Sequence, residues 1–98
     1  MIRHLVLFKL NDGVDREGDE RVAAGAKAFE ELGALIPELR EWECGWNTTT
    51  RDIAYDFAIN SLVDDRDALK AYLSHPAHQA AAAQWSEFAT WVIADIEV

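Results

Sequence analysis

Apolar residues alternate along the first ten positions of the chain, and this pattern predicts a strand over residues 2–10. Both faces of the strand are largely apolar: one carries Ile2, His4, Val6, Phe8 and Leu10, and the other carries Arg3, Leu5, Leu7 and Lys9. A strand that is apolar on both sides belongs in the middle of a sheet that is covered on both faces. Because a chain of 98 residues rarely covers both faces of an antiparallel sheet by itself, we expect a second copy on the face of Leu5 and Leu7.

A long helix is predicted next. Asn11, Asp12 and Gly13 are typical turn residues, and Asp15 is placed to cap the helix. Pro37 is expected to end it. The apolar side chains that recur at helical spacing between these limits are Val22, Ala26, Phe29, Leu32 and Ile36.

Two more strands are predicted between the helix and residue 63. Residues 40–47 alternate between aromatic or thiol side chains and charged or small ones, which is typical of a half-exposed strand. A polar loop over residues 48–52 separates it from a third predicted strand over residues 53–63. The side chains on the bulky faces of these two strands are Trp42, Cys44 and Trp46, then Tyr55, Phe57 and Ile59.

The second helix is expected to be split. The acid-rich residues 64–67 supply a helix start, because negative charge is favourable at the positive end of the helix dipole. Pro76 disfavours a helical conformation at His75 and suits the first turn of a new helix, so a second piece is predicted from Pro76 to about Phe88. Residues 91–98 alternate again and close the chain as a fourth strand.

The element order is therefore β-α-β-β-α-β, the ferredoxin-like motif, in which an α+β chain forms an antiparallel sheet. The length supplies one core, and no linker or repeat divides the chain. We expect a single domain over residues 1–98 that works as a homodimer.

Composition narrows the classes of function. Acidic residues outnumber basic ones by 18 to 9, so the net charge is −9 and neither nucleic acid nor an anionic membrane is an expected partner. No apolar run is long enough to cross a bilayer and no signal-peptide pattern opens the chain, so we expect a cytoplasmic protein. The single cysteine, Cys44, excludes an intramolecular disulfide and a thiolate metal cluster. No glycine-rich phosphate-binding pattern occurs, and no cofactor is predicted.

Three histidines and one tyrosine are the candidates for chemistry. If the helices cover the face of Phe8, His4 points into the same layer. Tyr72 and His78 are six residues apart, about 240° on a continuous helix, so they converge on this layer only if the helix bends at Pro76. A tyrosine hydroxyl paired with an imidazole in a dry pocket moves protons near neutral pH.

Each of these residues also has a structural interpretation. His4 can be a buried histidine satisfied by one hydrogen bond, His75 a helix cap before proline, and His78 a polar residue of a first helical turn. His75 and His78 lie three residues apart, but no carboxylate of defined geometry joins them and zinc takes three or four ligands. No metal site is therefore predicted.

A pocket for a small hydrophobic or aromatic molecule is predicted between the sheet and the helices. The four tryptophans, at positions 42, 46, 85 and 91, line such a pocket or form the core and the dimer interface, since aromatic residues dominate both environments. The residues predicted to line the pocket are Val6, Phe29, Tyr55, Phe57, Ile59, Trp85 and Phe88.

The motif at the helix break carries the most specific resemblance. It reads Tyr72, Leu73, Ser74, His75, Pro76, Ala77, His78. Together with residues 2–10 and the strand that contains Tyr55, it resembles the stress-responsive A/B barrel (Dabb) family from end to end. The resemblance implies a dimeric α+β barrel, in which two sheets pack face to face and each protomer keeps a pocket between its own sheet and helices.

Within this family the chain is similar to a plant polyketide cyclase, a cofactor-free enzyme that closes a linear polyketide by aldol condensation. The resemblance implies that Tyr72 and His78 form the acid/base pair and that His4 lies beside them and orients a substrate oxygen. A further pocket histidine of that enzyme falls at Phe57 here, which is a departure. Two other functions stay open: a stress-associated dimer without catalytic activity, and a monooxygenase or haem-handling enzyme on the same barrel.

Overall fold

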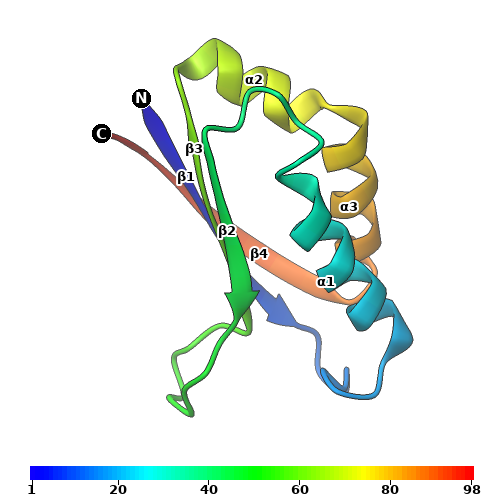
Figure 1. Cartoon of the computed structure of the whole chain (residues 1–98). Coiled ribbons are helices and arrows are strands. Elements are labelled where there is room, and N and C mark those ends of the chain that lie inside the picture. Colours follow the sequence, from blue (N-terminus) through cyan, green and yellow to red (C-terminus); the bar gives the residue numbers. More distant parts are fainter.

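Four antiparallel strands form one sheet in the order β2-β3-β1-β4, and three helices lie on one face of it (Figure 1). The computed structural model describes residues 1–98. The elements along the chain are β1 (Ile2–Leu10), α1 (Glu20–Leu32), β2 (Glu41–Trp46), β3 (Phe57–Val63), α2 (Arg66–Ser74), α3 (Pro76–Ser86) and β4 (Ala89–Glu97). The arrangement confirms the ferredoxin-like α+β fold with a split second helix.

β1 lies in the interior of the sheet, as its two apolar faces predict. It pairs with β3 on one side and with β4 on the other, and in this register His4 lies directly opposite Asp95 of β4. Side chains alternate along β1, so that His4, Val6 and Phe8 are buried towards the helices whereas Leu7 is exposed on the opposite face.

The first helix begins later than predicted. Its N-cap is Asp19, whose carboxylate accepts a backbone N–H of the first turn, and the prediction of Asp15 as the cap is wrong. Asp15 instead closes a turn by accepting the backbone N–H of Glu17 at 3.0 Å. The turn is tight: a Cβ added at Gly18 would lie 2.5 Å from the Asp15 carboxylate. The chain therefore completes this turn before the helix starts.

The same helix ends at Leu32, and the prediction that it extends to Pro37 is wrong. Gly33 packs directly against Trp42, because a Cβ added at Gly33 would lie 2.6 Å from the indole ring. Trp42 also donates its indole N–H to the carbonyl of Phe29 at 2.9 Å. Ile36 lies beyond the helix yet is buried, so its place in the helical spacing reflects burial and not helical structure.

β3 begins at Phe57, four residues later than the alternation predicts. Residues 51–54 contain a hydrogen-bonded turn instead of extended strand. Asp56 joins the end of this loop to β1: its carboxylate accepts the N–H of Leu10 at 2.7 Å, and its own N–H donates to the carbonyl of Phe8 at 2.8 Å. The loop thus closes against β1, and β3 starts after Asp56.

The helix break lies at His75 and Pro76, as predicted. His75 has the extended backbone that a following proline favours, ends α2 and caps α3, with its Nδ1 accepting the N–H of Ala77 at 3.1 Å. The interpretation of His75 as a cap is therefore confirmed. α3 ends at Ser86 and β4 begins at Ala89, each two residues earlier than predicted.

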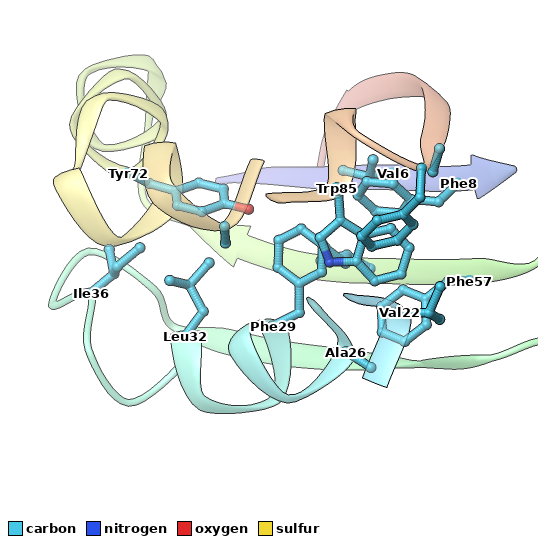
Figure 2. Close-up of a cluster of buried hydrophobic side chains, with 14 of the residues drawn as sticks. Val6, Phe8, Val22, Ala26, Phe29, Leu32, Ile36, Phe57, Tyr72 and Trp85 are labelled. Carbon is cyan, nitrogen blue, oxygen red and sulfur yellow. The ribbon is translucent and has the colours of Figure 1, made fainter. Parts of the chain in front are cut away.

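Trp85 stands in the middle of the core between the sheet and the helices (Figure 2). Its indole N–H donates to the carbonyl of Gly25 on α1 at 2.9 Å, which ties α3 to α1. The aromatic rings with centroids between 4.7 and 5.1 Å from that of Trp85 are Phe8, Phe29, Phe57 and Phe88. Packing of this kind fills the space around Trp85.

We expect Gly25→Ala to destabilise the fold. A Cβ at this position would lie 2.9 Å from Phe88 and 2.9 Å from the Trp85 indole nitrogen, and both rings are fully enclosed. Overpacking costs about 1–3 kcal/mol, which outweighs the gain of about 1 kcal/mol from replacing glycine in a helix. Urea denaturation measures the change. A Gly25→Ala protein that is as stable as wild type would contradict the close packing at Gly25.

The face of the sheet away from the helices is open (Figure 1). Leu7 of β1 and Val92 and Ile96 of β4 are exposed on it, and Leu5 lies between them half-buried. Large apolar side chains that gather on one open face mark an interaction surface. No helix of the structure has the length and apolar character needed to cross a membrane.

Candidate active site

A cavity of about 220 Å³ lies between the helix-covered face of the sheet and the junction of α2 and α3. Its wall is mostly apolar, and the imidazoles of His4 and His78 are its polar groups. The lining residues are His4, Val6, Phe8, Phe29, Leu73, His78, Ala82, Trp91 and Ile93. Since Trp91 and Ile93 of β4 are exposed, the cavity opens to solvent beside this edge strand.

His4 is held by a carboxylate. It is only 2% exposed, and its Nδ1 lies 2.5 Å from Oδ1 of Asp95, the residue opposite it on β4. An ionised carboxylate only accepts, so Nδ1 carries the proton and donates it to Asp95. The bond fixes the orientation of the ring, with Nε2 as its remaining hydrogen-bonding atom.

His78 stands in the first turn of α3 and is half-buried. Its Nδ1 lies 2.9 Å from the carbonyl oxygen of Leu73; because a carbonyl only accepts, Nδ1 carries the proton and Nε2 holds a free lone pair. Burial lowers the pKa of His78 below its ordinary value of 6.5; the hydrogen bond to Leu73 acts against this, and the charges of His4 and His75 lower the pKa further. His78 is therefore a neutral imidazole at neutral pH, the form that accepts a proton.

Tyr72 packs edge-on against both histidines. Its ring centroid lies 5.7 Å from that of His4 and 4.9 Å from that of His78, and the side chain is only 1% exposed. Burial raises the pKa of Tyr72 to about 12, a hydrogen bond with Ser61 acts in the opposite direction, and the charge of Asp95 adds to the increase. Tyr72 thus stays a neutral phenol at neutral pH and cannot serve as the base.

Together these side chains are suited to proton transfer. His78 offers a lone pair, His4 is held by Asp95, and Tyr72 packs edge-on against both imidazoles. A base in an apolar cavity with oriented hydrogen-bonding groups is the arrangement that general acid–base catalysis uses. No three His, Cys, Asp or Glu side chains converge closely enough to hold a metal ion.

The sequence model of the stress responsive A/B barrel domain matches residues 2–98. The chain belongs to the stress-responsive A/B barrel family. The resemblance at the helix break is thereby confirmed at the level of the family. A relative from Streptomyces coelicolor, the uncharacterized protein SCO4036, is 70% identical to this A/B barrel over 97 residues, which is 99% of each chain.

Solved structures support the same assignment. A dimeric ferredoxin-like protein of unknown function from Thermobifida fusca is 33% identical, with a TM-score of 0.86 over 99% of this chain and 90% of its own. A dimeric protein with a ferredoxin-like fold from Bacteroides fragilis is also 33% identical, with a TM-score of 0.83 over 99% and 95% of the two chains. Both neighbours are dimers, which supports the predicted homodimer.

A more distant neighbour shows the fold alone. Hydroxynitrile lyase from Passiflora edulis is 15% identical, with a TM-score of 0.80 over 99% of this chain and 92% of its own. The ferredoxin-like fold of this A/B barrel is therefore shared with an enzyme as well as with proteins of unknown function.

The structure brings together part of the predicted site. His4 and His78 line the same cavity, and Tyr72 lies behind them without lining it. Of the residues predicted to line the pocket, Val6 and Phe29 do so. The others that point to the helix side are buried in the core instead and are Phe57, Ile59, Trp85 and Phe88.

Tyr55 lies away from this cavity. It precedes β3 and belongs to the loop, where Lys9 lies over its ring at 5.9 Å from the centroid. It lines a separate depression together with Leu7, whose side chain is on the open face of the sheet. The alternation of side chains in a strand would put Tyr55 on the same face as Phe57. It does not apply here, because the chain makes a turn before β3 starts at Phe57.

Asp95 is the site residue that sequence reasoning missed. Its place depends on the register between β1 and β4, which sets it opposite His4, and no local pattern states a register. The available signal is the alternation of Trp91, Ile93 and Asp95 along the last strand, which puts all three on the face towards His4.

We expect His78 to titrate below the ordinary histidine range. Burial disfavours the charged ring, so the folded protein takes up this proton at lower pH than the unfolded chain does. The sign for stability follows: as the pH falls through about 6.5, the unfolded state gains a proton that folded His78 does not, and the stability falls. Proton NMR of the imidazole Cε1–H, assigned with His78→Gln, measures the midpoint. A midpoint equal to that of the urea-unfolded chain would contradict the burial of the ring.

Proposed function

We propose that this A/B barrel is a cofactor-independent acid/base enzyme that closes a linear poly-β-keto thioester by aldol condensation. The resemblance of its helix-break motif to the plant olivetolic acid cyclase suggests this reaction. The observation that carries the proposal is the neutral imidazole of His78, with a free Nε2, at the wall of an apolar cavity that also contains His4.

The chemistry assigns one role to each group. His78 Nε2 removes a proton from a methylene between two carbonyls, and the resulting enolate carbon attacks a second carbonyl carbon of the same chain. The alkoxide oxygen formed there takes back the proton that His78 removed and becomes a hydroxyl group. His78 then removes the second proton of the attacking carbon and passes it to this hydroxyl, which leaves as water, so the ring closes with a new carbon–carbon double bond and the loss of one water molecule. His4, held by Asp95, orients a substrate oxygen, and Tyr72 holds the His78 ring edge-on as a neutral phenol.

The cavity is compatible with such a substrate. A volume of about 220 Å³ with mostly apolar walls suits one ring with a short substituent. The distant likeness to a hydroxynitrile lyase adds that the fold can host an enzyme.

A second candidate is a stress-associated dimer that binds a small molecule without chemistry. The observation in its favour is that His4 and Tyr72 have structural contacts of their own: His4 is satisfied by Asp95, and Tyr72 is packed between two rings. A family relationship does not choose between the two functions.

Incubation of the purified protein with a linear poly-β-keto thioester separates them. The proposal expects a cyclised product of the mass of the substrate acyl chain less one water, detected by mass spectrometry and formed faster than in buffer. Binding of the thioester with no acceleration of ring closure would support the non-catalytic dimer and contradict the enzyme.

A further inference from the structure

A second hollow lies next to the histidine cavity. It has a volume of about 410 Å³ and is lined by Ile2, Arg66, Leu69, Asp95, Ile96 and Glu97. Asp95 also bonds to His4, so this side chain lies between the two hollows.

The two hollows are neighbours along the seam between α2 and β4, and we call this seam the groove. On α2, Leu69 lines the larger hollow and Leu73, one turn further, lines the histidine cavity. On β4, Ile93 lines the histidine cavity and Asp95, the next residue on the same face, lines the larger hollow. A ligand held at His78 can thus extend along α2 towards its first residue.

The far end of this groove carries free positive charge. Arg66 and Lys70 are one helical turn apart, both are exposed, and both border the same shallow hollow as Leu73. Neither takes part in an ion pair. Asp95 is bonded to His4, and Glu97 lines the larger hollow together with Arg66. Asp67, three residues before Lys70 on α2, is a second acidic side chain near the cations.

We infer that the groove binds an elongated amphipathic ligand whose apolar part lies in the histidine cavity and whose anionic group lies at Arg66 and Lys70. Arg66 stands seven positions before Leu73 on α2, a rise of about 10 Å along the helix axis. The anionic group at Arg66 is therefore about 10 Å from the wall of the histidine cavity that Leu73 forms. The inference rests on the proposed ligand cavity. The anion is a carboxylate on the ligand's own chain or a phosphate of a thioester carrier, because both bind guanidinium and ammonium groups.

Calorimetric titration with matched probes tests the inference. Wild type is expected to bind decanoate or decanoyl-coenzyme A about fivefold more tightly than 1-decanol, the size of effect that one or two exposed charge-assisted contacts give, and the preference should shrink with added salt. Arg66→Gln combined with Lys70→Gln should abolish it. The control is Lys27→Gln combined with Arg51→Gln, which removes two exposed cations that also lack ion pairs.

The outcomes distinguish failure of the anion site at Arg66 and Lys70 from failure of the ligand cavity itself. A preference for decanoate that the Arg66/Lys70 variant loses assigns the anion to a carboxylate, and a preference for the coenzyme A ester alone assigns it to the carrier phosphate. Equal binding of all three probes to wild type overturns the anionic end and leaves the cavity in place. Failure of all three to bind overturns the cavity as well.

Discussion

Replacement of His78 by alanine is expected to lower the rate of ring closure by about 10²- to 10⁴-fold, the contribution of a positioned proton-transfer group. The fold should lose little, because His78 is half-buried and its one hydrogen bond, to the Leu73 carbonyl, contributes about 1 kcal/mol. In a domain of this size such a loss lowers the melting temperature by about 4–8 °C. Paired thermal melting and turnover measurements on wild type and His78→Ala check both parts.

His75→Ala supplies the opposite pattern and serves as the control. His75 caps α3 through Nδ1 and does not line the cavity, so its loss should cost about 1 kcal/mol of stability and lower turnover far less than the loss of His78 does. A His78→Ala protein that melts far below His75→Ala, or that retains full turnover, would make His78 a structural residue. The proposed role of His78 as the base would then fail.

Leu7→Asp is expected to convert the dimer into a monomer. Leu7 is 44% exposed on the open face of the sheet, where exposed Val92 and Ile96 and half-buried Leu5 surround it. A second copy packed on this face would bury the new carboxylate without a partner, at a cost of several kcal/mol, on the order of a broken buried ion pair. Light scattering of micromolar protein reports the mass directly.

Leu35→Asp is the matched control for this effect. Leu35 is 56% exposed but lies in the loop after α1 and not on a strand of the sheet, so the same substitution should leave the dimer intact. A monomeric wild type would contradict the homodimer, and a Leu7→Asp protein that keeps the dimer mass would place the interface elsewhere.

Patterns of burial predicted the fold well and element ends poorly. The two apolar faces of β1 predicted its interior position, because side chains alternate along a strand. Pro76 predicted the split helix, because proline disfavours a helical conformation in the residue before it. The start of α1 depended on which of two acidic residues caps its first turn. Asp19 is the cap, whereas Asp15 closes a turn before the helix. Both are good caps, so sequence preference alone does not separate them.

In the candidate site, too, features set by local sequence were predicted and features set by tertiary packing were not. Strand parity and the bend at Pro76 were enough to bring His4 and His78 to one cavity. The Asp95 carboxylate depends on a strand register across 91 positions of chain, and Tyr55 left the pocket because its loop closes on β1 through Asp56. The predicted lining also failed where aromatic rings pack on Trp85, since packing in three dimensions decides which side chains leave a space.

The proposed function requires that the cavity beside His78 receives a small ligand at the imidazole. A crystal structure of the protein with a 2,4-dihydroxybenzoic acid that bears an alkyl chain, the kind of product that aldol closure gives, tests it directly. We expect density for the benzene ring among the side chains of Val6, Leu73 and Trp91, with one of its hydroxyl oxygens about 2.6–3.2 Å from His78 Nε2. An empty cavity at saturating ligand, or a ligand bound only on the open face of the sheet, would contradict it.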